Sequence, residues 1–376
     1  MIKIFRKWMY RYFADQEAVL VVVLLVAGIA VLMTMGDILA PMIASIVIAF
    51  LMEGMVARLN GRGVPHIVSV CITFVVLVGA MAVVLLIVLP GLWQQLVNLF
   101  TEIPRMLAEA RRVALLLPEQ YPTIFSEETI DTIIRNATNK IGALGENVLS
   151  ISITKLPVFI GLVIYIVLVP ILVFFFLKDG KKILRQLASL LPDERPVMTK
   201  IWVEMNIQIA NYVRGKAIEI LVVAAVSFIV FQLMGLNYAL LLAIAVGFSV
   251  VIPYIGAAVV TLPIAVIAYF QWGWSSEFMW LMIAYGIIQM LDGNVLVPLL
   301  FSEAVNLHPI AIILSVLVFG GIWGFWGIFF AIPLATLIKA IINAWPVREN
   351  RNRQSELLLQ SATAEADKDS GDQDAA

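Results

Sequence analysis

Long apolar runs alternate with short polar sequences along most of this chain. Five runs are long enough for a helix to cross about 30 Å of hydrocarbon, and they lie at residues 18–35, 38–57, 67–89, 157–177 and 217–235. Together with the apolar segments further along the chain, they predict an all-α fold. We expect a polytopic helical bundle with about eight membrane spans.

Short polar or helix-breaking sequences predict the ends of these spans. The Gly-Asp pair at 36–37 predicts a tight turn between the first two spans, and the Pro-Gly pair at 90–91 predicts the end of the third. The charged sequence at 178–182 predicts the end of the fourth span. Residues 194–214 are expected to form a separate amphipathic helix before the span at 217–235, because their apolar positions recur at helical spacing.

Two apolar segments near the C-terminus are interrupted in the middle and predict broken hairpins. The first covers residues 238–270 and is interrupted by Pro-Tyr-Ile-Gly at 253–256. The second covers residues 309–342 and is interrupted by a glycine-rich sequence at 320–327. Each arm has only about 15 residues, which is short for a full span, so re-entrant and fully spanning hairpins both fit.

A single apolar helix precedes each hairpin, at residues 217–235 and 278–291, and a Gly/Asn/Pro-containing connector follows the second helix at 292–308. The unit of one helix and one broken hairpin therefore occurs twice. We expect the two copies to form an inverted repeat. Such repeats with interrupted helices place transport sites near the midplane of the bilayer.

Residues 91–156 differ from the rest of the chain, because charges fill the gaps between apolar residues at i, i+3 and i+4 spacing. They predict a pair of amphipathic helices outside the hydrocarbon core, the second of them capped by Ser126. The pair lies on the membrane surface or packs against a neighbouring subunit, and we favour the subunit contact. Residues 346–376 are charged and lack aromatic residues, so a disordered tail is expected.

Basic residues near the span ends predict the orientation. Four Lys or Arg residues precede the first span, residues 178–216 contain eight Lys or Arg against four Asp or Glu, and the loop at 271–277 contains no Lys or Arg. This asymmetry predicts a multi-pass protein of the bacterial inner membrane with both termini in the cytoplasm and a periplasmic insert. The predicted segments are an N-terminal three-helix membrane segment (1–90), the insert (91–156), the fourth span with a cytoplasmic amphipathic helix (157–216), a transport core with both hairpins (217–345) and the tail (346–376).

The composition agrees with a membrane protein and excludes several functions. Hydrophobic residues make up 62% of the 376 residues and charged residues 14%, against about 25% charged residues in soluble domains. The formal net charge of −1 gives a nucleic-acid partner no electrostatic support. The single cysteine, Cys71, permits no internal disulfide and is expected to be buried as a small apolar residue. Two histidines are too few for a histidine-based metal site, so no metal or cofactor is predicted.

Four short sequences resemble the AI-2E family of autoinducer-2 exporter-like permeases, and they lie at residues 251–256, 289–298, 307–309 and 324–333. The resemblance covers nearly the whole chain. It implies an eight-span-type bundle with a large insert after the third span, a homo-oligomer, and export of small molecules. Some members of the family resemble autoinducer-2 exporters and others resemble Na⁺/H⁺ antiporters, so the resemblance does not fix the substrate.

The two hairpin tips supply the first candidate residues for a transport path. An open tip leaves backbone N–H and C=O groups without helical partners, which is costly in lipid, so each tip must face protein or water. The candidates are Pro253, Tyr254 and Gly256 in the first tip, and Gly324 and Gly327 in the second. Close packing of small residues between helices is the alternative explanation for both tips.

Polar side chains beside the spans supply further candidates. Gln289, Asp292 and Asn294 cluster where the helix at 278–291 ends, and they either line the path or cap the connector. Asn211 and Arg214 form a candidate cytoplasmic entrance that would face an anionic or polyol substrate. A role as positively charged anchors on the cytoplasmic side is the alternative for this pair.

Acidic residues inside a membrane are functional candidates by default, so Glu53, Glu219 and Asp292 are candidates for ion coupling. Two of them also have simpler explanations. Glu219 is one turn from Lys216 and would form an ion pair that reaches the membrane surface, and Glu53 lies near Arg58 at the end of its span.

The residues predict a transport protein and not an enzyme. No nucleotide-binding sequence G-x-x-x-x-G-K-[ST] occurs, so active transport would draw on an ion gradient or a partner, and no Ser/His/Asp arrangement stands out. We expect a secondary-type exporter of small polar molecules, autoinducer-2-like molecules among them, embedded in the lipid bilayer. A Na⁺/H⁺ antiporter is the first alternative, and a non-transporting scaffold or passive channel is the second.

Overall fold

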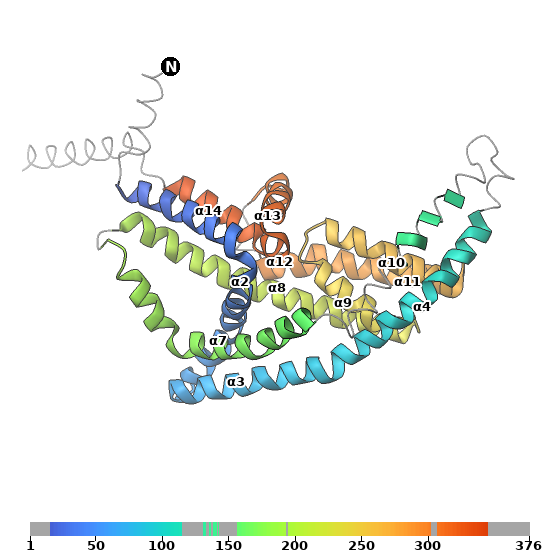
Figure 1. Ribbon diagram of the computed structural model, residues 1–376, viewed down its shortest axis with the longest axis horizontal. Helices are drawn as coiled ribbons and strands as arrows, with labels where there is room; N and C mark the ends of the chain where they lie inside the picture. The colour runs from blue at the N-terminus through green and yellow to red at the C-terminus, as the bar shows by residue number, and fades with distance from the viewer. Residues whose placement is uncertain are drawn as a thin grey trace, which may run out of the picture. The chain divides into compact units, whose positions relative to one another are not determined.

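The computed structural model describes residues 16–114, 156–192, 195–301 and 307–344, together with a few positions between 131 and 142. Every regular element in these residues is helical, which confirms the all-α prediction (Figure 1). Eight stretches of the described helices are long and apolar enough to cross a membrane. The predicted tail at 346–376, Ser126 and most of the second insert helix lie outside the described residues.

The first two predicted spans form one continuous helix, α2 (Gln16–Gly61), so the tight turn predicted at 36–37 is wrong. Gly36 serves close packing instead of a turn. A Cβ atom at this position would lie 2.7 Å from the Trp323 ring nitrogen Nε1, so only glycine leaves room for the indole. The helix also continues through Pro41.

The third predicted span likewise continues past its predicted end at the Pro-Gly pair. Helix α3 (His66–Val83) runs into a π-helical turn, η1 (Val84–Val88), and then into α4 (Leu89–Ala114), so the predicted stop is wrong. The N–H of Leu89 bonds the carbonyl of Val84, five residues back. This wider turn already interrupts the α-helical hydrogen-bond ladder directly before Pro90, which makes the missing proline N–H easier to accommodate. Helix α4 carries the charges of the predicted amphipathic helix, and Arg111 on it makes two hydrogen bonds to Asp131.

Helices α7 (Leu156–Ala188) and α8 (Pro196–Leu233) are also longer than predicted, because each continues through a predicted helix end. Helix α7 continues through the charged residues at 178–182. Lys and Asp are compatible with helical geometry, and their charged side chains can reach water where the helix leaves an apolar environment. The amphipathic segment and the fifth span form the single helix α8. Gly215 does not interrupt α8, and its missing side chain makes room for the ring of Phe301, which a Cβ would approach to 2.8 Å.

Both predicted hairpins are present. The first consists of α9 (Ala239–Ser249) and α10 (Ile255–Trp272). The second turns inside α13 (Pro309–Phe329), where Trp323 and Gly324 have non-helical backbone angles, and α14 (Ala331–Ala344) follows its second arm. Helix α11 (Ser276–Leu291) matches the single helix expected between them. The connector predicted at 292–308 is partly wrong, because a π-helical turn, η2 (Asp292–Leu296), and α12 (Val297–Phe301) continue α11.

The chain divides into two compact units, and each hairpin belongs to a different one. The first unit comprises Met1–Leu39, Lys181–Tyr212 and Ala304–Ala376, and the second Ala40–Gly180 and Val213–Glu303. In the second unit, α9, α10 and α11 lie side by side (Figure 1), and with the C-terminal part of α8 they form its largest core, which includes Phe231, Ile264 and Leu281. Many large apolar side chains remain exposed, as expected for lipid-facing helices. Cys71 is exposed as well, so its predicted burial is wrong, because it lies on the outer face of the apolar helix α3.

Candidate functional site: open hairpin tips and a buried charge cluster

The first hairpin tip lies at residues 250–254, so it overlaps the interruption predicted at 253–256 but begins three residues earlier. Tyr254 has a φ of 63°, a left-handed conformation that is unusual for a residue other than glycine, and its side chain is 65% exposed. Gly256 packs directly against the backbone of the preceding arm, since a Cβ atom there would overlap the carbonyl oxygen of Ser249. Pro253 is half-buried, and its carbonyl accepts a hydrogen bond from the N–H of Ile255. The tip is therefore a tight turn that depends on glycine.

The second tip is also a tight turn in which a glycine packs against a backbone carbonyl. Its chain departs from helical geometry at Trp323 (φ −134°, ψ 17°) and Gly324 (φ 57°, ψ −134°). Gly327 then packs against the opposite arm, because a Cβ there would overlap the carbonyl oxygen of Phe319. Each tip thus brings a glycine against a carbonyl seven or eight residues earlier in the chain. The two tips therefore share a local turn geometry.

A tyrosine of α8 binds the C-terminal end of α13, five residues after Gly324. The hydroxyl of Tyr212 donates a hydrogen bond of 2.9 Å to the carbonyl of Phe329, and both residues are buried in the first unit. Their rings also meet edge to face, with centroids 6.1 Å apart. Phe329 is the last residue of α13, so its carbonyl belongs to a helix end that lacks a full set of helical partners.

We expect Tyr212→Phe to lower the free energy of unfolding by about 1.5 kcal/mol, because it leaves a buried carbonyl without its hydrogen-bond donor. Chemical unfolding of the purified protein in detergent would measure the change. An unchanged free energy of unfolding would show that the Phe329 carbonyl finds another donor or water.

A buried lysine of α8 contacts the first tip in the second unit. The Nζ atom of Lys216 donates a hydrogen bond of 2.9 Å to the carbonyl of Val250, and it lies 2.6 Å from the Glu219 Oε2 atom. The two residues are only 4% and 2% exposed. Lys216 also lies over the ring of Phe301, 5.2 Å from its centroid. This lysine therefore joins the open backbone of the tip to a buried acid.

Asp292 extends this cluster from η2. Its carboxylate interacts electrostatically with both Lys216 and Glu219. Among the described residues, its Oδ1 atom is buried without a hydrogen-bond partner, and the same holds for Gln289 Nε2 and Arg214 Nε. Such unpaired buried polar atoms are rare in folded proteins, and bound water or an ion is one physical explanation for them. We call Lys216, Glu219 and Asp292 the charge cluster.

The other predicted site residues are not brought into this cluster by any contact of the described chain. Asn294 is exposed, and its amide donates to the carbonyl of Met290 on its own helix. Glu53 and Asn211 are exposed. Arg214 is half-buried, with Nε about 4.0 Å from the position of a Cβ on Gly54. The described residues contain no group of three or more His, Cys, Asp or Glu residues that would hold a metal ion.

Sequence reasoning assigned no site role to Lys216 and Tyr212. Both lie in a segment whose basic residues were attributed to the cytoplasmic loop, and neither residue type marks a site by itself. The one available signal was the i, i+3 spacing of Lys216 and Glu219 at the start of an apolar run, which predicts an ion pair. The contact of Lys216 with the hairpin tip depends on tertiary structure.

Comparison with known proteins shows which family this chain belongs to. A family profile described as "AI-2E family transporter" matches residues 20–347. The chain belongs to the AI-2E transporter family. The "Putative permease PerM" of Escherichia coli (strain K12) is 46% identical over 346 residues, which cover 92% of this chain and 98% of that protein. The "Putative transport protein YueF" of Bacillus subtilis (strain 168) is 26% identical over 305 residues, covering 80% of this chain and 82% of that protein.

Membership of the AI-2E family agrees with the fold and with the class of function. The matched region includes both broken hairpins and the charge cluster. The chain is a multi-pass membrane protein of a transporter family, and the names of its relatives describe permeases and transport proteins, not enzymes.

Proposed function

We propose that this protein is a secondary-type transporter of the bacterial inner membrane that exports small polar molecules and acts as a homo-oligomer. Autoinducer-2-like molecules are the substrate that the family resemblance suggests. The observation that carries the proposal is the contact between the charge cluster and the first tip. A buried lysine, two acids and an open backbone meet there within an apolar fold, and ionisable groups inside a membrane mark transport paths.

The cluster suggests how an ion gradient acts on the hairpin. Lys216 is shared between the carbonyl of Val250 and the carboxylate of Glu219, and Asp292 competes for its positive charge. A proton or cation that neutralises one acid weakens the electrostatic attraction that this acid exerts on Lys216. The hydrogen bond from Lys216 to the Val250 carbonyl at the tip would change in strength as a result. The exposed Tyr254 and the buried Gly256 at that tip are the first proposed path residues. The others are Pro253, Gln289, Asp292 and Asn294, and Gly324 and Gly327 at the second tip.

The proposed topology is the one that the basic residues favour, with cytoplasmic termini and the tips entering the membrane from opposite faces. Asn211 and Arg214 then lie on the cytoplasmic side and form the proposed entrance. Na⁺/H⁺ antiport is a second candidate function, favoured by the two carboxylates of Glu219 and Asp292 that share one lysine. A passive channel would show conductance in planar bilayers without an ion gradient as driving force.

Transport into everted membrane vesicles tests the proposal. Vesicles that contain the protein should accumulate labelled autoinducer-2 when energised, and Asp292→Asn should reduce the initial rate about tenfold or more, because it removes one charge that competes for Lys216. The matched control is Glu204→Gln, an exposed acid outside the cluster that was not predicted as a site residue, which should leave the rate within about twofold. An equal rate in Asp292→Asn vesicles would contradict the proposed site. Sodium-driven proton movement without solute accumulation would favour antiport instead.

A further inference from the structure

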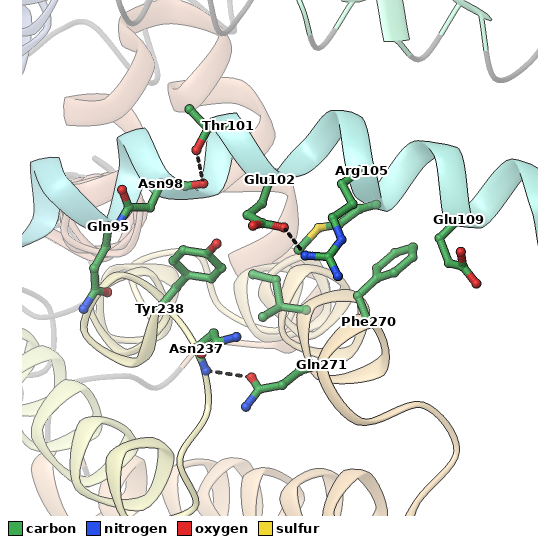
Figure 2. A pocket seen from close by; sticks show the side chains of 12 residues that line it. Gln95, Asn98, Thr101, Glu102, Arg105, Glu109, Asn237, Tyr238, Phe270 and Gln271 are labelled. Carbon is green, nitrogen blue, oxygen red and sulfur yellow. Dashed lines mark hydrogen bonds and ion pairs between the residues drawn. The ribbon is translucent and has the colours of Figure 1, made fainter.

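A polar cavity lies between α4 and the base of the first hairpin, at the opposite end of that hairpin from the tip (Figure 2). Its volume is about 870 Å³, and all of its walls belong to the second compact unit. It is separate from the charge cluster, and no function considered so far uses it. Twelve residues line it, among them Glu102, Arg105 and Glu109 from α4, and Tyr238 and Phe270 from the hairpin.

Two glutamines fix the shape of this cavity. Helix α9 begins after Tyr238, which provides no side-chain cap, and Gln95 of α4 supplies the missing acceptor to the N–H of Leu241 at 2.9 Å. On the other side, Gln271 accepts a hydrogen bond from the N–H of Asn237 at 2.8 Å and donates one to the carbonyl of Gly235 at 2.7 Å. The walls are therefore held by hydrogen bonds before any ligand binds.

The charged residues of the lining favour a cation. Glu102 and Glu109 lie seven residues apart on α4, which places them about 10 Å apart along the helix axis and on the same side. Arg105 is the one basic residue among the lining residues, so the lining carries one net negative charge. Glu102 lies 3.7 Å from Arg105, and Glu109 lies 3.9 Å from Arg112, but these pairs are exposed and therefore weak.

Apolar and aromatic residues also belong to the lining. Met106, Ile267 and Phe270 are apolar residues of the lining, and in the view of Figure 2 both Arg105 and the ring of Phe270 appear between Glu102 and Glu109. Tyr238 adds a second aromatic ring, and aromatic faces attract ammonium groups. Burial raises the pKa of the Tyr238 phenol, and the nearby Glu102 carboxylate raises it further, so this hydroxyl stays neutral at physiological pH.

We propose that this cavity binds a linear diamine or polyamine. Its ammonium groups would meet the carboxylates of Glu102 and Glu109, and its methylene chain would lie over Met106, Ile267 and Phe270. Two separated anions in one cavity that also presents apolar and aromatic side chains match a molecule with two separated cations and an apolar stem. An anion or a compact neutral molecule would leave this pattern unmatched. The inference does not depend on the direction or substrate of transport by the charge cluster.

Binding of radiolabelled spermidine to the full-length protein tests the inference. The protein would be reconstituted in nanodiscs of zwitterionic phosphatidylcholine, so that anionic lipids do not bind the probe. We expect saturable binding that weakens as salt rises, competition by cadaverine, and no competition by glutarate or by a neutral diol of similar length.

Charge variants decide whether the cavity is the site. The double variant Glu102→Gln/Glu109→Gln should weaken spermidine binding about tenfold, whereas Arg105→Gln should tighten it about twofold or more, because it removes a competing cation. Glu204→Gln, an exposed acid outside the cavity, is the control and should bind normally. Absence of saturable binding, equal competition by the diol, or the same affinity in the double variant and Arg105→Gln would overturn the inference.

Discussion

Replacing Gly256 by alanine is expected to abolish transport and to lower the free energy of unfolding by about 3 kcal/mol. A Cβ at this position overlaps the carbonyl oxygen of Ser249, and that oxygen is part of the backbone, so no side chain can move away to relieve the clash. The first tip must open or shift. Gly327→Ala should act in the same way at the second tip, where the overlap is with Phe319.

Chemical unfolding in detergent and transport in everted vesicles would measure both effects. Gly286→Ala is the matched control, because Gly286 lies within α11 and no atom lies within 4 Å of its would-be Cβ. Alanine there should stabilise the protein by about 0.5–1 kcal/mol, since glycine is the poorer helix former. If Gly256→Ala were as stable and active as the control, the proposed tightness of the tip would be wrong.

The second large effect is expected for Lys216→Met, which should lower the free energy of unfolding by about 3–5 kcal/mol and abolish transport. The variant leaves the carboxylate of Glu219 buried without its cation and the carbonyl of Val250 without its donor. Removal of one partner from a buried ion pair typically has a cost of this size.

A double variant separates stability from function at the charge cluster. Lys216→Met/Glu219→Leu removes both charges, so most of the lost stability should return, because an apolar pair can replace a buried ion pair at little cost. Transport should stay absent, since the double variant lacks the lysine whose positive charge attracts Asp292. Recovery of transport together with stability would show that the cluster only holds the fold together.

The apolar pattern predicted which parts of the chain are membrane helices, but it placed several helix ends wrongly. A turn was expected at Gly36, a helix end at Pro90 and a division between residues 214 and 217, and the structure continues through all three. Two of these positions are explained by contacts that the sequence does not display: Gly36 makes room for an indole and Gly215 for a phenyl ring. The sequence alone does not distinguish a glycine that ends a helix from a glycine against which a side chain of another helix packs.

The hairpin tips were predictable because their signals are local. Proline, glycine and short apolar arms mark a break regardless of the surrounding fold. The second break falls within the predicted sequence and the first overlaps its predicted sequence. The charge cluster was only partly predictable, because Glu219 and Asp292 are 73 positions apart in the sequence and only the fold brings them together around Lys216. Lys216 was missed as a site residue because a lysine next to a span normally reaches toward the membrane surface.

Thiol accessibility at the two tips tests the central claim most directly. In a Cys71→Ser background, single cysteines would replace Tyr254 in the first tip and Phe325 in the second, both of which are exposed. Membrane-impermeant reagents would then be applied to right-side-out and everted vesicles. We predict that the cysteine at 254 is labelled only from the cytoplasmic side and the cysteine at 325 only from the periplasmic side. Labelling of both from the same side, or of neither, would contradict the proposal that two open tips enter the membrane from opposite faces.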